Sequence, residues 1–247
     1  MKRLRLIIPA LFGFSLVVQA ALICDLDTLS EGHVETNASG EVVQWLDQSG
    51  YGHNAADASM VGTMKYPSES LSRAGLSGVD MGSDRNGFRL FTATEQDAWL
   101  DFAGLASTNT GFAVFVAFKA DGVEPGIKPL FANHGNVSTA NSFGMRVNAA
   151  EKFEVFLGGA LYKKSGGEAL APGDTVVLGF NYDAATGAFE FWDSKNQSSL
   201  AGTISASNFS SVQDLYLGTS ANAGQYLDGM IAEVLVYDTV LSAAEFA

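Results

Sequence analysis

Two glutamates have the side chains and the setting best suited to acid–base chemistry. In GAFEFWD (187–193), strand alternation places Glu190 and Trp192 on one face. In KFEVFL (152–157), the same alternation places Glu154 on the face opposite the first phenylalanine. If the two strands are neighbours, a carboxyl pair about 5–9.5 Å apart beside an indole could cleave a glycosidic bond. The alternative is two solvated glutamates on a half-exposed sheet, which is the commoner situation.

Trp192 is a better candidate for binding than for catalysis. An aromatic ring on the polar face of a strand can stack on the C–H face of a sugar, while a neighbouring carboxylate accepts hydroxyl hydrogen bonds. Three tyrosines expected in loops or at strand ends could extend this platform: Tyr51, Tyr162 and Tyr226. Each of them alone is more often a partly covered surface residue. The sequence therefore predicts a ligand-binding surface centred on Trp192.

A calcium ion is the one cofactor that the sequence suggests. Calcium needs six to eight oxygen ligands, with carboxylates among them. Asp228 in YLDG could meet Asp25 or Asp27 if the first and last strands pair. The alternative is that Asp228 and the glycine after it form an ordinary turn. The acidic stretch 80–87 resembles a calcium loop but lacks the closing glutamate of an EF-hand, so we discount it.

The stretch VVQWLDQSGYGHNA (42–55) combines polar side chains, glycines and a histidine. Short polar side chains can bond backbone N–H groups at strand ends, and glycine supplies the backbone angles of a tight loop. His53 has no second histidine at metal-ligand spacing. We therefore predict a loop that turns a corner rather than one that carries out chemistry. Its structural residues are expected to be Trp45, Asp47, Ser49, Gly50 and Gly52.

These residues must be positioned by strands, because strand patterns fill the chain. Strands are expected over 112–119, 152–157, 175–183, 187–193, 214–218 and 230–238. The turn from Asp183 to Gly187 predicts a hairpin, and the spacing of Ser242 and Glu245 predicts the start of a short helix. No linker or repeat interrupts the pattern. We expect one all-β antiparallel sandwich domain over residues 22–247.

The N-terminus and the charge restrict location and partners. A basic start, an apolar run and small residues over 1–21 are typical of a secretory signal peptide, cleaved near Ala20 or Ala21. We expect a secreted or cell-surface protein without membrane insertion after cleavage. With one cysteine, Cys24, the chain can form no internal disulfide. Its net charge of −13 makes nucleic acid a poor partner.

Three blocks of this sequence resemble a known family. They are W-x-D-x-S-G-x-G-H-N-A over 45–55, Y-D-x-x-x-G over 182–187, and the block from Leu215 to Glu245. Together they resemble the LamG-like jelly-roll domains of the concanavalin A-like lectin/glucanase superfamily, over roughly Leu22 to the end. The chain departs from the family where Phe91 is followed by Thr-Ala rather than D-G, and where WDSK replaces V-D-G.

The resemblance implies a two-sheet antiparallel jelly roll, often with one bound calcium ion, and no fixed enzymatic activity. Glucanases of the superfamily carry E-x-D-x-x-E, and the nearest string here, 95–100, ends in Leu100 instead of the acid. The first hypothesis is a secreted, non-catalytic module that binds a polysaccharide or glycoconjugate. The alternatives are a polysaccharide-degrading enzyme using Glu154 and Glu190, and an adhesion or matrix module that binds protein.

Overall fold

In the computed structural model, most of the described residues lie in short antiparallel strands. The described residues are 20–28, 33–57, 78–82, 88–91, 111–121, 126–133, 142–157, 160–163, 167–204, 215–220 and 225–246. Residues 1–19 of the expected signal peptide lie outside these ranges. No helix within the described part of the chain is long and apolar enough to cross a membrane.

Among the described residues, the strands follow one another along the chain and one short helix lies at the end. They are β1 (Leu22–Asp27), β2 (Val34–Thr36), β3 (Val42–Trp45), β4 (Ala55–Asp57), β5 (Val79–Gly82), β6 (Phe88–Phe91), β7 (Phe112–Ala120), β8 (Lys128–Ala132), β9 (Phe143–Val147), β10 (Phe153–Leu157), β11 (Ala160–Lys163), β12 (Thr175–Tyr182), β13 (Ala188–Asp193), β14 (Ser198–Thr203), β15 (Leu215–Leu217) and β16 (Gly229–Tyr237), followed by α3 (Ala243–Phe246).

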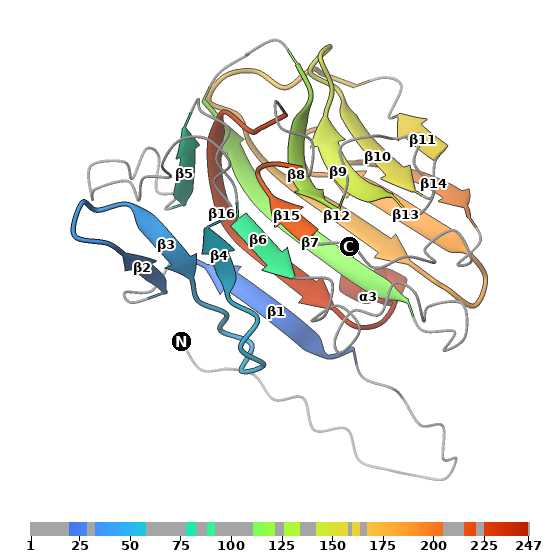
Figure 1. The fold of residues 1–247 in the computed structure, drawn as a ribbon. Coiled ribbons are helices and arrows are strands. Elements are labelled where there is room, and N and C mark those ends of the chain that lie inside the picture. The colour runs from blue at the N-terminus through green and yellow to red at the C-terminus, as the bar shows by residue number, and fades with distance from the viewer. Residues whose placement is uncertain are drawn as a thin grey trace, which may run out of the picture.

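The described strands form two sheets (Figure 1). Sheet A has the order β1-β16-β7-β12-β13-β14, with β5 also pairing with β16. Sheet B has the order β11-β10-β9-β8-β15-β6-β4-β3-β2. Neighbouring strands are antiparallel, as in β7 with β12 and β8 with β9. This architecture confirms the all-β sandwich expected from the sequence.

Aromatic side chains join the two sheets in the core. Phe112 of β7 and Phe180 of β12 belong to sheet A, and Phe143 of β9 belongs to sheet B. The ring of Phe143 lies 5.3 Å from that of Phe112 and 5.1 Å from that of Phe180, centroid to centroid. All three are fully buried. Alternation along each strand therefore brings one residue in two into a shared apolar layer.

Strand β7 is apolar on both faces, and its position explains why. It lies between β16 and β12 in the middle of sheet A. Val114 and Val116 face the core, while Phe115 is half-buried on the opposite, outer face. The ring of Phe246, in the C-terminal helix, lies 5.3 Å from the ring of Phe115. The C-terminus thus covers part of the outer face of sheet A, where an apolar residue is then favourable.

Two local predictions from turn and cap residues are confirmed. The Asp183 carboxylate accepts hydrogen bonds from the N–H of Ala185 at 2.9 Å and the hydroxyl of Thr186 at 2.7 Å, and Gly187 has a φ of 74°. This turn connects β12 to β13 as a hairpin. At the C-terminus, the Glu245 carboxylate accepts hydrogen bonds from the N–H and the hydroxyl of Ser242 at 2.9 and 2.6 Å. This pair begins helix α3 as a capping box.

Candidate functional site

The structure separates the two candidate catalytic glutamates. Glu190 lies in β13 of sheet A, and Glu154 lies in β10 of sheet B. The two strands are therefore not neighbours, and the condition for a shared acid pair is not met. Local alternation placed each glutamate on a face of its own strand correctly, but it carries no information on which sheet a strand joins.

Glu154 belongs instead to a buried ion pair. Its side chain is 1% exposed, and its Oε2 lies 2.9 Å from Nη2 and 3.0 Å from Nε of Arg146. Its other carboxylate oxygen accepts a hydrogen bond from the side-chain amide of Asn148. The guanidinium carbon of Arg146 lies 5.2 Å from the centre of the Phe156 ring. Charge pairing and a cation–π contact together satisfy this cluster in a nearly dry position.

Glu190 and Trp192 share the outer face of β13, and both are half-buried. Cross-strand register places Trp192 between Gly179 of β12 and Ser199 of β14. The same register places Glu190 between residues 181 and 201. The indole is thus flanked by a glycine on one side and a serine on the other. A flat apolar surface beside a carboxylate and a hydroxyl is a combination that can contact a sugar ring.

The C-terminal segment borders this surface on one side. Trp192, Phe115 and Tyr237 pack against a small buried cluster that includes Leu241 and Phe246. Polar contacts as well as packing hold the C-terminal segment in this position. The side-chain amide of Asn181 donates to the carbonyl of Leu241 at 2.8 Å and accepts from its N–H at 2.9 Å. The C-terminal segment therefore covers part of the surface around the indole.

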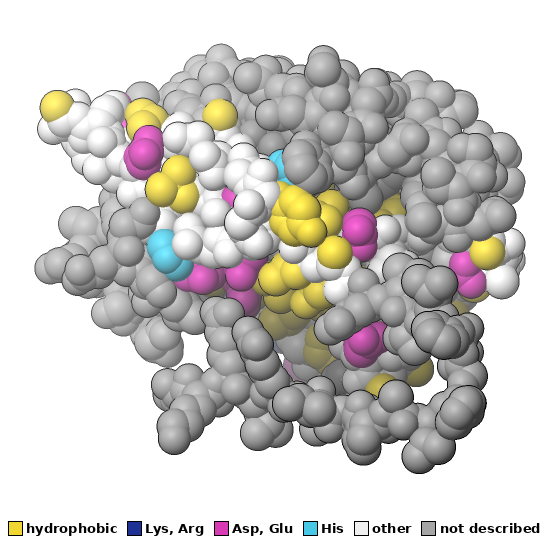
Figure 2. Space-filling view, turned by 90° about the horizontal axis from the view of Figure 1, so that it is seen from below, with side chains coloured by type: hydrophobic (Ala, Val, Ile, Leu, Met, Phe, Trp, Pro, Cys, Tyr) yellow, Lys and Arg dark blue, Asp and Glu magenta, His cyan; other side chains and the backbone are white. Residues whose placement is uncertain are grey.

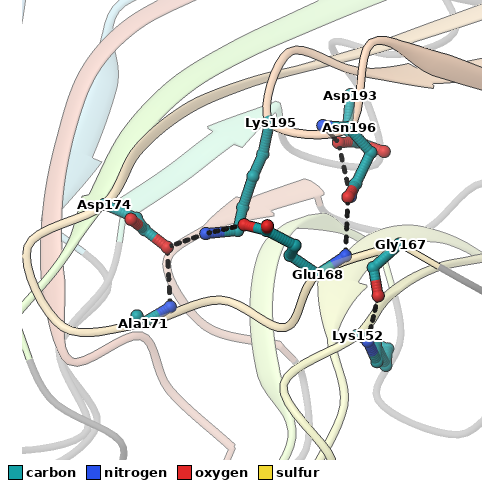
Figure 3. Close-up of polar contacts among 8 residues, drawn as sticks. All are labelled: Lys152, Gly167, Glu168, Ala171, Asp174, Asp193, Lys195 and Asn196. Carbon is teal, nitrogen blue, oxygen red and sulfur yellow. Dashed lines mark hydrogen bonds and ion pairs between the residues drawn. The ribbon is translucent and has the colours of Figure 1, made fainter.

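A polar network fixes the turn that follows Trp192 (Figure 3). The buried Asp193 carboxylate accepts hydrogen bonds from the backbone N–H of Asn196 at 2.7 Å and from its side-chain amide at 3.0 Å. The Asn196 side-chain oxygen in turn accepts from the N–H of Glu168 at 2.7 Å. The Lys195 ammonium lies 2.5 Å from Oδ2 of Asp174. This network joins the β13–β14 turn to the loop before β12.

The charge states in this network follow from the same contacts. The hydrogen bond to Asp174 is the main cause that raises the pKa of Lys195. Burial acts to raise the pKa of Asp174, but hydrogen bonds from Lys195 and from the N–H of Ala171 lower it overall. The raised pKa of Lys195 and the lowered pKa of Asp174 both favour the charged forms of these two residues. Asp193 and Lys195 are thus structural residues of the turn, and they leave Glu190 as the acceptor beside the indole.

The three tyrosines do not gather around Trp192. Tyr51 is 45% exposed and stacks on His53, with ring centroids 6.1 Å apart. Its loop bonds to β1, and four strand spacings, about 19 Å, separate β1 from β13 in sheet A. Tyr226 is half-buried and forms a bridge with Thr219, beyond the end of β15 in sheet B. Tyr162 lies in β11, and its side chain lies outside the described part of the structure.

The carboxylate of Asp47 organises the loop around Tyr51. It accepts hydrogen bonds from the N–H groups of Asp25, Ser49 and His53 at 2.8–2.9 Å. It also accepts one from the Ser49 hydroxyl at 2.7 Å. Gly50 and Gly52 have φ values of 92° and 81°, which favour glycine. Trp45 is fully buried, and its indole N–H donates to the carbonyl of Asp27 at 3.0 Å. These contacts hold the chain reversal between β3 and β4.

The first and last strands pair, as the calcium hypothesis requires, but the acids do not meet as expected. Asp25 lies opposite Leu235, and Asp27 lies opposite Glu233. Asp228 is five residues before Glu233, or about 17 Å along an extended strand. No group of three or more His, Cys, Asp or Glu side chains in the described ranges is arranged to hold a metal ion.

The register instead brings Asp25 and Asp27 near Glu233, an acid that the sequence did not single out. Burial, followed by the charges of Asp25 and Asp27, raises the pKa of Glu233. Nδ1 of His33 lies 2.9 Å from Oδ1 of Asp27. Acidic side chains surround apolar ones on the face shown in Figure 2, where no Lys or Arg is visible among the described residues. Glu233 could not be placed in this group from the sequence, because the grouping depends on the β1–β16 register.

A family model for laminin-G-type domains matches residues 92–247, and its description is the concanavalin A-like lectin/glucanases superfamily. The chain belongs to this superfamily. The match covers the closing block on which the resemblance depended most, and it confirms the family predicted from the sequence. The block over 45–55 lies before the matched residues. Among curated proteins, no significant match was found.

Solved structures with a similar fold include a sialidase and a sialidase CBM40. A mutant of Trypanosoma rangeli sialidase displaying trans-sialidase activity has a TM-score of 0.59 and 14% identity, over 92% of this chain and 32% of that chain. The CBM40 of Ruminococcus gnavus IT-sialidase, bound to alpha2,3 sialyllactose, has a TM-score of 0.50 and 17% identity, over 68% of this chain and 92% of that chain. The present chain spans about a third of the sialidase's length. At these identities the likeness concerns the fold.

Proposed function

We propose that the chain is a non-catalytic carbohydrate-binding module, and that its contact surface is the outer face of β13 and β14 around Trp192. One observation carries the proposal: a half-buried indole lies beside a carboxylate on an outer strand face, with a serine on the neighbouring strand. The indole of Trp192 stacks on a sugar ring. Glu190 and Ser199 accept and donate hydrogen bonds to ring hydroxyls.

The separation of Glu154 from Glu190 supports binding without cleavage. Most glycoside hydrolases use two carboxyl groups about 5–9.5 Å apart on one surface. Glu190 has no such partner across its strand pairs, which place Asn181 and Ala201 beside it. Glu154 is committed to Arg146. The superfamily hosts binding modules and enzymes alike, so the site rather than the fold favours binding.

The charge around the indole favours an uncharged glycan. The cross-strand neighbours of Trp192 and Glu190 are Gly179, Ser199, Asn181 and Ala201, which carry no charge. Glu190 adds a negative charge, and the chain as a whole carries −13. A carboxylated sugar would be repelled here. We therefore propose neutral polysaccharide as the ligand class, in a secreted or cell-surface setting that follows from the expected signal peptide.

The test is affinity electrophoresis of residues 22–247 through a panel of neutral and acidic polysaccharides, followed by titration calorimetry with the best ligand. We expect Trp192→Ala to weaken binding about tenfold or more, since a desolvated aromatic contact contributes on the order of 1 kcal/mol or above. Tyr51→Ala, which removes an exposed ring on a distant loop, is the matched control. Unchanged affinity of Trp192→Ala at unchanged melting temperature would overturn the proposed surface.

The same gels address calcium and protein partners. Each polysaccharide is run with calcium and with EDTA, and loss of retardation in EDTA would bring Asp228, Asp25 and Asp27 back as candidate ligands. Retardation that persists in EDTA would remove calcium from the proposal. If no polysaccharide retards the chain, the glycan proposal fails, and an adhesion module that binds protein becomes the leading hypothesis.

A further inference from the structure

The last described residues of the chain, 241–246, form a short strap on the outer face of sheet A (Figure 1). Leu241 and Phe246 are buried against the sheet, whereas the four residues between them are exposed. The helix in the strap, α3, has four residues, which is too few to be stable without the sheet. Among the described residues, two apolar side chains and two hydrogen bonds of Asn181 hold the strap in place. The strap therefore rests on few contacts, as segments that open locally do.

The strap fills a gap among the side chains of this face. Gly179 of β12 pairs with Phe115 of β7 on one side and with Trp192 of β13 on the other. A Cβ added at Gly179 would lie 3.0 Å from an atom of the Phe115 ring and 3.1 Å from an atom of the Phe246 ring. The Phe246 ring thus lies over the glycine, in the space that a longer side chain would take. Trp192 packs against the same cluster, so a ring of the strap occupies the position beside the indole.

The position of this ring suits a sugar as well as a phenylalanine. The C–H face of a sugar ring stacks on aromatic side chains, and the gap over Gly179 has one on each side, Phe115 and Trp192. Asn181 lies two residues along β12, opposite Glu190. Its side-chain amide donates to one strap group at 2.8 Å and accepts from another at 2.9 Å. Sugar hydroxyls both donate and accept, so they can replace both strap groups.

We propose that the strap is a displaceable cover, and that a neutral sugar ring binds over Gly179 in place of Phe246, beside a ring stacked on Trp192. This deepens the proposed function and rests on it, because the strap and the ligand compete for one position. The affinity measured for the wild type is then the intrinsic affinity multiplied by the fraction of molecules in which the strap is lifted. A change that loosens the strap without entering the gap should therefore tighten binding.

Two substitutions loosen the strap in different ways. Phe246→Ala removes the ring that fills the gap, and Ser242→Ala removes an exposed hydroxyl that donates to the Glu245 carboxylate at 2.6 Å. Affinity electrophoresis in increasing concentrations of dextran, mixed-linkage β-glucan and galactomannan, three neutral polysaccharides, gives the dissociation constants. We expect binding about tenfold tighter or more in Phe246→Ala. We expect binding about fivefold tighter in Ser242→Ala, the size of a typical cap contribution. Val43→Ala, which removes an exposed apolar side chain from sheet B, is the control and should leave the affinity unchanged.

Amide hydrogen exchange shows whether the strap lifts. The N–H of Leu241 donates to the side chain of Asn181 in the free protein, which protects this N–H from exchange. With saturating polysaccharide it should exchange faster than in the free protein, because the ligand takes over the Asn181 amide. Exchange that slows or stays the same on binding would overturn the proposal, since the ligand would then lie on a closed strap.

The outcomes separate the strap from the binding surface itself. Equal or weaker binding by both loosened variants, with wild-type binding that depends on Trp192, would overturn the strap and leave the proposed surface intact. If no neutral polysaccharide retards the wild type or Phe246→Ala, the proposed function fails and the strap fails with it. Melting temperatures identify a variant that has unfolded, and Ser242→Ala, altered at an exposed position, then decides the test alone.

Discussion

At the scale of single residues, the Asp47 carboxylate shows how a conspicuous motif can be structural. Burial acts to raise its pKa, but hydrogen bonds from the N–H groups of Asp25, Ser49 and His53 and from the Ser49 hydroxyl lower it overall. The folded loop therefore favours the charged form of the Asp47 carboxyl group. Because the folded pKa lies below the unfolded value of about 3.9, this stabilisation is complete above that value. It is lost as the pH falls through the folded pKa.

We predict that Asp47→Asn lowers the free energy of unfolding by about 2 kcal/mol at pH 7, since an amide nitrogen would then face the N–H of His53. Urea denaturation of wild type and variant from pH 7 to pH 3 measures the difference. The gap should begin to narrow below about pH 4, where the carboxylate of the unfolded wild type takes up a proton, and should narrow further as the pH falls toward the lower folded pKa. Glu35→Gln, at an exposed position, is the control. A gap that is independent of pH would refute the electrostatic account.

The Arg146–Glu154 pair makes a second residue-scale prediction. Arg146→Leu should lower the free energy of unfolding by about 3–5 kcal/mol, because it leaves Glu154 charged and buried without its partner. The double variant Arg146→Leu/Glu154→Leu should recover most of this loss, since it removes both charges. Chemical denaturation of the two variants measures both effects. Equal losses in the single and double variants would mean that packing, not charge, dominates.

At this scale, the sequence predicted which residues share a face of one strand, because that depends only on local alternation. Glu190 and Trp192 do share a face, because residues two apart on one strand always do. Alternation could not predict the ion-pair partner of Glu154 or the residue that lies opposite Asp27. Arg146 reaches Glu154 from β9, and Glu233 reaches Asp27 from the far end of the chain. Such contacts depend on strand order and register, which a single sequence specifies only weakly.

At the scale of elements, the β12–β13 hairpin depends on Gly187. Its φ of 74° favours glycine, and an added Cβ would lie 2.5 Å from the carbonyl oxygen of Ile204. We predict that Gly187→Ala lowers the free energy of unfolding by more than the roughly 1–2 kcal/mol of left-handed strain alone. Gly173→Ala is the matched control, since Gly173 has a φ of 88° and open space around it. Thermal unfolding of both variants measures the difference, and equal losses would contradict the clash with Ile204.

The C-terminal helix makes a prediction for the proposed site. Phe246 packs against Phe115 and belongs to the cluster that borders Trp192. In Phe246→Ala, the indole gains contact with water, so the Trp192 contribution to fluorescence should shift to longer wavelength. That contribution is obtained by subtracting the spectrum of the Trp192→Phe variant from that of the protein that retains Trp192. The subtraction is made once for the wild type and once for Phe246→Ala. An unchanged emission maximum would show that the helix does not shield the indole.

Elements with a strong pattern were predicted, and weak ones were not. The central strand β7, the β12–β13 hairpin and the C-terminal cap followed from apolar runs, turn residues and cap spacing. β14 was missed because an edge strand with four exposed residues has little apolar alternation to detect. β2 and β4 were missed because their three residues, VET and AAD, show no apolar alternation.

At the scale of the whole molecule, the two-sheet sandwich and the superfamily were both predicted from sequence and are confirmed. The net charge of −13 acts at this scale too. It disfavours anionic partners on average, and its effect weakens with added salt. We predict that binding of a neutral polysaccharide is insensitive to salt between about 50 and 500 mM, as measured by calorimetry. A strong salt dependence would point to a charged ligand instead.

The central claim, binding without cleavage at Trp192, is tested most directly by one combined measurement. The chain is incubated with the polysaccharide that retards it, and both retardation and polymer length are followed over a day, for the wild type and for Trp192→Ala. We predict that the wild type is retarded, that Trp192→Ala is not, and that polymer length stays constant in both. Shortening of the polymer by the wild type would contradict the claim and identify an enzyme.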